Sequence, residues 1–199
     1  MAQSLCRLGI GKVILLDYDN VEISNLNRQI LYSRSDLGKV KAEQAALHLK
    51  ELHCVGEHTK VEWRSYCALK NWSKVVTLAK ESTVVFNMID YGDHFDAAVQ
   101  SLCLKLNLPL FLGGTFNQSL SLDIFIPDNN TPCYGCISDN LKPEMLEKIS
   151  KEKILDLDDI SFLPKDDHPE GVSNSYLAAT AANLLVAQFS SYLLADPEV

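Results

Sequence analysis

Several acidic, amide and basic residues that could bind a ligand follow the first apolar run of the chain. That run ends at Asp17, and the sequence continues through Asn25, Asn27 and Arg28 to Lys41. An acid at the end of a strand can hydrogen-bond a ribose, whereas arginine can grip phosphate with a planar fork and lysine with a point charge. Asp17 could equally cap the strand and begin a turn, as aspartate often does. On spacing alone both interpretations stand.

A CxxC sequence, Cys133 to Cys136, offers two thiolates after a predicted edge strand. Structural zinc takes four tetrahedral ligands, so this pair is a zinc half-site, with His168 as a possible third ligand. A redox role is less favoured, because a thioredoxin-type CxxC begins a helix in a different context. The other cysteines lie among apolar neighbours and are expected to be buried small hydrophobes: Cys6, Cys54, Cys67 and Cys103.

The composition limits the classes of partner. The 199 residues are 47% apolar and carry a formal net charge of −8, which excludes a disordered chain and argues against nucleic acid or an anionic membrane as the main partner. No run approaches the roughly 18 to 20 consecutive apolar residues of a membrane span, and no signal peptide is visible. Cysteines in such an acidic chain favour a reducing compartment, so a cytoplasmic location is expected.

The apolar pattern alternates between strand and helix. This alternation predicts an α/β fold, a doubly wound, Rossmann-like, mostly parallel sheet, with an antiparallel strand over 120–126 that extends it after residue 114. Residues 137–172 are rich in charge and are expected to form a solvated crossover segment with a short helix over 144–152. A final helix over 174–194 is expected to be buried on much of its circumference. The remaining predicted strands are 12–17, 59–63, 83–89 and 109–112, and the remaining helices are 37–52, 72–79 and 95–106.

The first residues read as the last two turns of a helix that ends at a Gly9 cap. In nucleotide-binding sheets a Gly-rich turn precedes the ribose-binding acid by about 20 residues. Counting back from Asp17 therefore places such a turn just before Met1. We expect residues 1–199 to be one domain whose first strand and Gly-rich loop lie upstream.

A longer motif carries a family resemblance. The pattern DxDxVxxSNLNRQ at 17–29, followed by GxxKA at 38–42, resembles the ThiF/MoeB superfamily, which includes the activating enzymes of ubiquitin-like proteins. The resemblance covers essentially the whole chain. It implies that Asp17 binds the ATP ribose, that Arg28 and Lys41 contact the phosphates, and that Asn25 or Asn27 shapes the same pocket. It also implies that Asp90 coordinates Mg²⁺ beside the acyl phosphate, although Tyr91 stands here where the family usually has Asn.

Compact single-domain members of this family carry a catalytic cysteine after Gly-Val, just ahead of the last helix. Here Gly171-Val172 is followed by Ser173. Serine is a poor nucleophile without an adjacent base, and it is a favoured helix N-cap, so Ser173 is interpreted as the cap of the final helix. In zinc-bearing members the second cysteine pair lies beyond that helix.

These residues favour an enzyme that uses ATP and Mg²⁺ to adenylate the C-terminus of a ubiquitin-like or sulfur-carrier protein, as a homodimer or related heterodimer. Zn²⁺ is a further candidate cofactor, held by Cys133 and Cys136. The alternative is a non-catalytic partner subunit or pseudoenzyme of the same fold, which the absent Gly-rich loop and Ser173 would suit. A nicotinamide dehydrogenase would explain Asp17 but not the rest of the motif.

Overall fold

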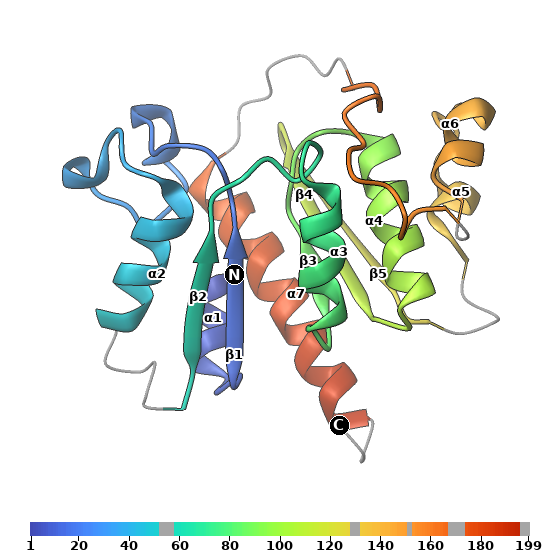
Figure 1. The fold of residues 1–199 in the computed structure, drawn as a ribbon. Coiled ribbons are helices and arrows are strands. Elements are labelled where there is room, and N and C mark those ends of the chain that lie inside the picture. The colour runs from blue at the N-terminus through green and yellow to red at the C-terminus, as the bar shows by residue number, and fades with distance from the viewer. Residues whose placement is uncertain (52–57, 128–131, 151–152, 167–173, 196–199) are drawn as a thin grey trace. The chain divides into compact units, whose positions relative to one another are not determined.

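The computed structural model describes residues 1–51, 58–127, 132–150, 153–166 and 174–195. These residues form α-helices and two hydrogen-bonded sheets, which belong to two compact units (Figure 1). Unit 1 comprises residues 1–67, 115–119 and 172–199, and unit 2 comprises residues 68–114 and 120–171. The mixed α/β class predicted from the sequence is confirmed.

Unit 1 is built on two parallel strands, β1 (Lys12–Leu16) and β2 (Lys60–Arg64), paired from Lys12 opposite Lys60 to Leu16 opposite Arg64. Helices α1 (Ala2–Arg7) and α2 (Lys41–Glu51) pack on them. Apolar side chains from all four elements form its core, which includes Cys6, Val13, Ala46, Leu49 and Val61.

Glycines with positive φ mark the end of α1 and precede the start of α2. Gly9, with a φ of 81°, follows α1, as the sequence predicted. Gly38 has a φ of 79°, and α2 begins only at Lys41 rather than at residue 37. The preceding residues form two short 3₁₀ turns instead, η1 (Ile23–Asn25) and η2 (Arg34–Asp36).

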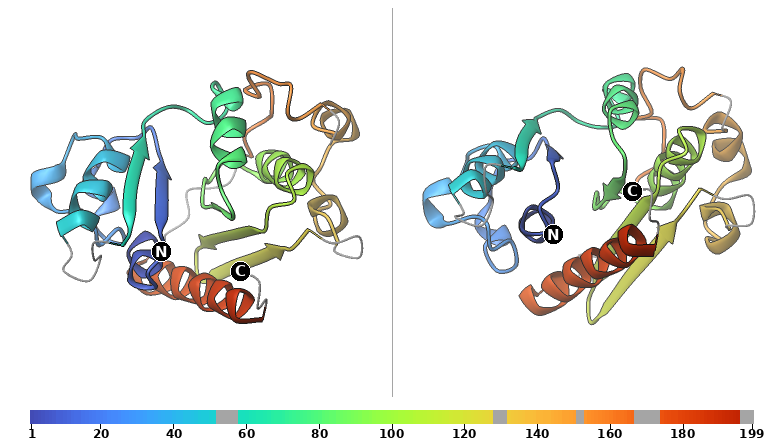
Figure 2. Two further views of the ribbon diagram at one scale, coloured as in Figure 1. Left: turned by 60° about the horizontal axis from the view of Figure 1, so that its bottom comes forward. Right: turned by 90° about the horizontal axis from the view of Figure 1, so that it is seen from below.

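Helix α7 (Ser175–Ala195) packs beside α1 in unit 1, and Figure 2 shows the two helices next to each other. The expectation that it is buried on much of its circumference is wrong. Its buried residues form one stripe, and Tyr176 and Leu194 are more than 80% exposed. Among the described helices, α7 is the one long and apolar enough to span a membrane, although a core helix can meet the same criterion. The stripe is Ala181, Ala182, Leu185, Val186 and Phe189.

Unit 2 holds most of the sheet β3–β4–β5, with β3 (Val85–Asn87) parallel to β4 (Leu110–Phe116); residues 115–119 at the β4–β5 turn are assigned to unit 1. Strand β5 (Ser119–Phe125) follows β4 through a two-residue turn in which Asn117 has a φ of 51°. Such a short connection makes β4 and β5 antiparallel neighbours, as predicted. Helices α3 (Trp72–Lys80) and α4 (Asp93–Lys105) supply large buried side chains, with Trp72 edge-on to Phe95.

The charge-rich segment of unit 2 is packed more tightly than its composition suggests. It contains α5 (Tyr134–Ile137) and α6 (Pro143–Lys148), which is shorter than predicted. The expectation of a solvated segment is wrong for four of its apolar residues, which are at most 2% exposed, whereas others such as Ile137 and Phe162 are exposed. The indole Nε1 of Trp72 donates to the main-chain oxygen of Ile154 at 2.9 Å. The four residues are Ile149, Ile154, Ile160 and Leu163.

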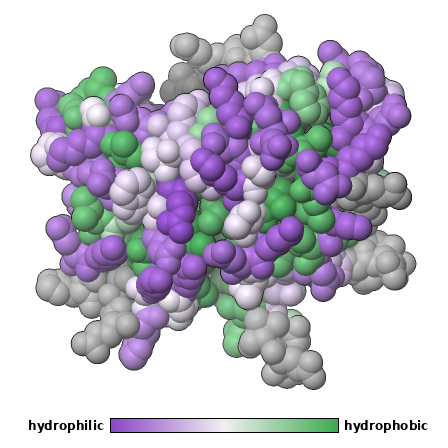
Figure 3. All heavy atoms as spheres, in the orientation of Figure 1, coloured by the Kyte–Doolittle hydropathy of each residue, from purple (hydrophilic) through white to green (hydrophobic). Residues whose placement is uncertain are grey.

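Polar side chains dominate the face drawn in Figure 3, with smaller apolar patches among them.

Candidate functional site

Asp17 lies directly after β1, at the carboxyl end of the parallel pair of unit 1. Its main-chain N–H donates to the oxygen of Arg64 at 3.2 Å, which continues the ladder by one step. Its side-chain Oδ1 accepts the N–H of Asp19 at 2.9 Å, so the turn that the sequence allowed is present. Burial raises the pKa of the Asp17 carboxyl group. The ligands of parallel sheets bind at this end of the strands, so the position suits a ribose-binding acid.

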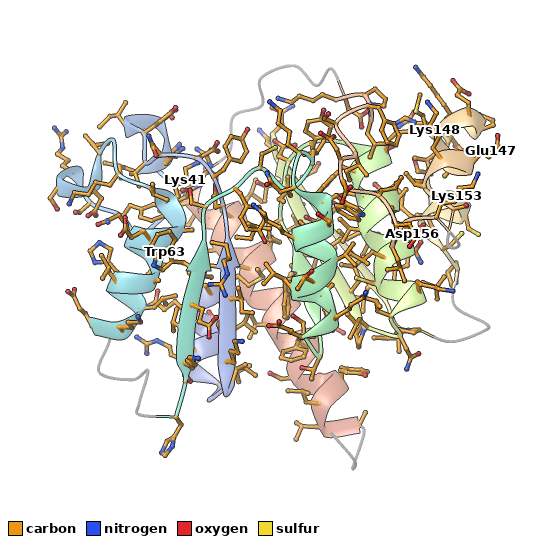
Figure 4. All side chains as sticks on the ribbon, viewed as in Figure 1. Lys41, Trp63, Glu147, Lys148, Lys153 and Asp156 are labelled. Carbon is orange, nitrogen blue, oxygen red and sulfur yellow. The ribbon has the colours of Figure 1, made fainter. Side chains whose placement is uncertain are left out.

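Lys41 is the first residue of α2 and is only 8% exposed. Its Nζ lies 3.0 Å from Oδ2 of Asp19. The helix dipole disfavours a positive charge at a helix N-terminus, and the Asp19 carboxylate offsets that cost for Lys41. Tyr32 donates its hydroxyl hydrogen to the main-chain oxygen of Lys41 at 3.1 Å. Figure 4 labels Lys41 at the end of α2 nearest the carboxyl ends of β1 and β2. The sequence analysis missed that Asp19 and Tyr32 contact Lys41. The only signal for either residue was that Asp19 is the second acid of the DxD motif.

The β1–α2 loop (residues 17–40) carries the other polar residues of the motif. Asn25 is 6% exposed and its Oδ1 accepts the N–H of Glu22 at 2.9 Å, so it shapes the loop from inside. Arg28 is half-buried, and its Nη1 donates to the main-chain oxygen of Ser24 at 2.9 Å and to Oδ1 of Asn27 at 3.0 Å. Asp17, Arg28 and Lys41 therefore belong to one unit and to one loop–helix junction.

Asp90 belongs to unit 2, in the turn between β3 and α4, and its side chain is exposed. The last residue of β3, Asn87, is 6% exposed and accepts the N–H of Ile89 at 3.2 Å. An exposed carboxylate after a strand is open to a hydrated Mg²⁺ ion, which binds one or two carboxylates and keeps several waters. The residue therefore fits the metal-binding role that the resemblance implies.

A partly buried acidic network at the N-terminus of α4 was missed in the sequence analysis. The hydroxyl of Tyr134 donates to Oδ1 of Asp93 at 3.0 Å and lies 3.4 Å from Oδ2 of Asp96. Asn87 donates from Nδ2 to Oδ1 of Asp96 at 2.7 Å. Burial, together with the nearby charge of Asp93, raises the pKa of Asp96 to about 7. The carboxylates sit three residues apart on a helix, a spacing that could have signalled the network.

In the sequence, Tyr134 and Gly135 stand between the two cysteines of the CxxC. The Sγ atoms of Cys133 and Cys136 lie 3.5 Å apart. In the part of the chain that the structure describes, no group of three or more His, Cys, Asp or Glu side chains could hold a metal ion, so zinc stays a prediction. Cys6 and Cys103 are each 1% exposed, as predicted, and burial raises the pKa of Cys103 to about 12.

The predictions for the burial of Cys54 and Cys67 and for the N-cap of the final helix are confirmed in none of the three cases. Cys67 is half-buried, and Cys54 lies outside the described residues. Ser173 and His168 also lie outside them. The cap of α7 is Asn174, whose Oδ1 accepts the N–H of Leu177 at 2.9 Å, so the prediction that Ser173 is the cap is wrong by one residue.

Comparison with known proteins places these features in context. The model of the ThiF family matches residues 1–197. The chain is 35% identical over 140 residues to "Adenylyltransferase and sulfurtransferase MOCS3" of Drosophila ananassae, which covers 68% of this chain and 29% of that protein. It is 29% identical over 211 residues to "Ubiquitin-like modifier-activating enzyme 5" of Drosophila mojavensis, which covers all of this chain and 48% of that protein. The chain thus spans half or less of the length of these relatives.

Solved structures support the fold. Escherichia coli MccB in its crystal structure with ATP aligns with a TM-score of 0.69 and 23% identity, over 94% of this chain and 49% of that one. The SeMet PaaA structure aligns with a TM-score of 0.65 over 96% of this chain and 60% of that one. At these identities the likeness concerns the Rossmann-like fold.

Proposed function

Since the chain belongs to the ThiF family, we propose that it binds ATP and adenylates the C-terminal carboxylate of a ubiquitin-like or sulfur-carrier protein. One observation carries the proposal: a partly buried acid, Asp17, and a buried cation, Lys41, meet at the carboxyl end of β1 and β2. The names of the two relatives, an adenylyltransferase and a modifier-activating enzyme, point to the same chemistry.

The charges at this junction fit a nucleotide on an otherwise acidic chain. ATP carries about four negative charges, which a surface of net charge −8 would repel unless cations are placed locally. Lys41 and Arg28 supply that charge, and each already has oxygen partners, Asp19 for Lys41 and Ser24 and Asn27 for Arg28. Phosphate oxygens would replace or share those partners. The raised pKa of Asp17 indicates a carboxyl group removed from water, where a hydrogen bond from a ribose hydroxyl is stronger.

The proposed step needs no proton transfer. A carboxylate oxygen of the protein substrate attacks the α-phosphorus of ATP. A new O–P bond of a mixed anhydride forms as the bond between the α-phosphorus and the α–β bridging oxygen breaks. Pyrophosphate leaves with the electron pair, and an acyl-adenylate remains. Lys41 and Arg28 would neutralise charge on the phosphates, so catalysis would consist of positioning and electrostatic stabilisation.

Mg²⁺ would neutralise phosphate charge in this step, and Asp90 is the residue of this chain proposed to hold it. The exposed carboxylate of Asp90 follows β3 and can reach a hydrated ion without losing an internal contact of the sheet. Loss of this ligand should raise the Mg²⁺ concentration needed for activity more than it changes nucleotide affinity.

ATP–pyrophosphate exchange tests the proposal directly. The assay measures isotope entering ATP from labelled pyrophosphate, with candidate ubiquitin-like and sulfur-carrier proteins as substrates. Exchange should appear with a matching substrate and require Mg²⁺. R28A and K41A should each lower exchange by about 10² or more, because each removes a charge-assisted phosphate contact in a site that excludes water. K50A, which removes an exposed lysine from α2, is the matched control and should leave exchange unchanged.

Binding measurements separate catalysis from the alternative. ATP binding without exchange against any candidate would favour a non-catalytic partner subunit of the same fold. No binding at millimolar ATP would contradict the enzyme proposal. A second copy or a related chain is the proposed assembly partner, because α7 leaves Tyr176, Leu184 and Leu194 exposed on an uncharged helix. Light scattering after size-exclusion chromatography tests it, and a strictly monomeric mass would contradict it.

A further inference from the structure

The β1–α2 loop is closed at its neck by main-chain hydrogen bonds. The N–H of Lys41 donates to the oxygen of Asp19 at 2.8 Å, and the N–H of Val21 donates to the oxygen of Lys39 at 2.8 Å. An isolated antiparallel bridge pairs Asn20 with Val40. These bonds fix where the loop begins and ends, but Arg28 lies well beyond them. Other contacts must set its position.

A hydrogen bond between a buried carboxylate and a histidine joins the far part of the loop to α2. Asp36, at the end of η2, is 2% exposed, and its Oδ2 lies 3.1 Å from Nε2 of His48. The same oxygen accepts the N–H and the hydroxyl hydrogen of Ser33, both at 2.8 Å. A buried carboxylate that loses one of its hydrogen-bond partners is costly, so the loop conformation that keeps His48 on Asp36 is preferred.

His48 and Lys41 lie on the same face of α2. They are seven residues apart, which is two helical turns and about 10 Å along the axis. Tyr32 reaches the main chain of Lys41 at the start of this face, and Asp36 reaches His48 further along it. The residues between Arg28 and Lys41 are therefore attached to α2 at two points.

The geometry points to His48 as a positioning residue for nucleotide binding: through Asp36 it holds the β1–α2 loop against α2 and so sets Arg28 relative to Lys41. This inference rests on the proposed function for the roles of Arg28 and Lys41. His48 itself touches neither of them in the contacts described above. It acts on the loop, and the loop carries the arginine.

The charged side chains of Glu51 and Lys39 also lie near the Asp36–His48 pair. Nδ1 of His48 lies 3.7 Å from Oε2 of Glu51, and Nζ of Lys39 lies 3.8 Å from Oδ1 of Asp36. The hydrogen bonds from Ser33, with those from His48, hold the pKa of Asp36 below its ordinary value, so this carboxylate stays charged at neutral pH. Glu51 is 77% exposed at its side chain and Lys39 is 51% exposed, so both are weak partners beside Nε2 of His48.

The test compares H48L, H48Q and the control K50A. H48L removes the donor, whereas H48Q keeps an N–H donor at similar reach. H48L should raise the KM for ATP in the exchange assay about tenfold, the worth of one charge-assisted hydrogen bond, with kcat changed less than about twofold. H48Q should recover most of the loss, and K50A should match the wild type. In a D36N background the effect of H48L should shrink to less than half, because the partner is already altered.

Hydrogen exchange of the nucleotide-free protein gives a readout that does not depend on activity. H48L should speed amide exchange in residues 22–37 and leave β1 and β2 at wild-type rates. Unchanged KM and unchanged loop exchange in H48L would overturn the inference, and so would faster exchange spread over β1 and β2 as well. If the wild type catalyses no pyrophosphate exchange, the proposed function fails, and amide exchange alone then decides whether His48 holds the loop.

Discussion

The carboxyl group of Asp96 should make unit 2 less stable as the pH rises from about 4 to about 7. In the folded chain its pKa is about 7, against an ordinary value of 3.8, because the group is buried and lies near Asp93. Between about pH 4 and pH 7 the folded state therefore holds a proton that the unfolded state has lost. Stability falls with increasing pH wherever the folded state binds more protons.

The size of the effect follows from the same values. A pKa about 3 above the ordinary one corresponds to about 4 kcal/mol, since each pKa unit is worth about 1.36 kcal/mol. This figure is an upper limit, because Asp93 and Asp96 titrate as an interacting pair. D96N is neutral at every pH and its amide oxygen can still accept from Asn87. On these values it should be more stable than the wild type by up to about 2 kcal/mol at pH 5, where the unfolded chain has already lost the proton, and by up to about 4 kcal/mol at pH 8.

Urea unfolding followed by tryptophan fluorescence measures this difference. The buried Trp72 reports on unit 2, and a W63F background removes the second tryptophan, which is 37% exposed. The curves are recorded at pH 5, 6, 7 and 8 for the wild type, D96N and the control D139N, which changes an exposed carboxylate. A wild-type-minus-D96N difference that stays constant across this range would refute the reasoning, as would a D96N protein less stable than the wild type at pH 8.

Three further substitutions test the packing and the surface charges. G92A should lower the free energy of unfolding by about 2 kcal/mol or more. Gly92 has a φ of 134°, and a Cβ there would overlap the Asp166 carboxylate that accepts the N–H of Asp93. Denaturant titration measures the change, and the control G11A should alter the free energy of unfolding little. W72F should lower the free energy of unfolding by about 2 to 3 kcal/mol in the same titration, because it removes the hydrogen bond to the main-chain oxygen of Ile154 and leaves a cavity. A loss below about 1 kcal/mol would contradict the described packing of Trp72. E62Q should lower the melting temperature at low salt only. Hydrogen bonds from Lys60 and Arg64 hold the pKa of Glu62 at about 2, and both cations are exposed enough for salt to screen them. A difference that persists in about 1 M NaCl would argue against this.

Local signals in the sequence were enough to locate most of the secondary structure. Apolar β-branched runs placed β1, β2 and β3 within two residues at their starts, and helical spacing placed α3, α4 and α7 similarly. The errors arose where a tertiary contact or a backbone angle overrode the pattern. The positive φ of Gly38 delayed α2 to Lys41, and the packing against Trp72 buried Ile154 and its neighbours inside a segment whose average composition is charged.

The candidate site divides in the same way. The sequence motif pointed to Asp17, Arg28 and Lys41 because their types and order are local, and unit 1 places them at one junction. The partners of these residues come from elsewhere in the chain: Asp19 pairs with Lys41 across 22 positions, and the hydroxyl of Tyr32 bonds the backbone of α2. No short-range pattern distinguishes such a partner from any other surface acid or tyrosine.

The sequence by itself determined the fold class, the family and the residue types available for binding a nucleotide, because periodicity and motif spacing are properties of neighbouring residues. The tertiary structure alone decided which of these groups are buried and what they contact. Burial raises the pKa of Asp17 and Asp96, and the pairing of Asp36 with His48 is created by a loop folding onto a helix. Desolvation and charge pairing depend on distances in space, which the order of residues along the chain does not state.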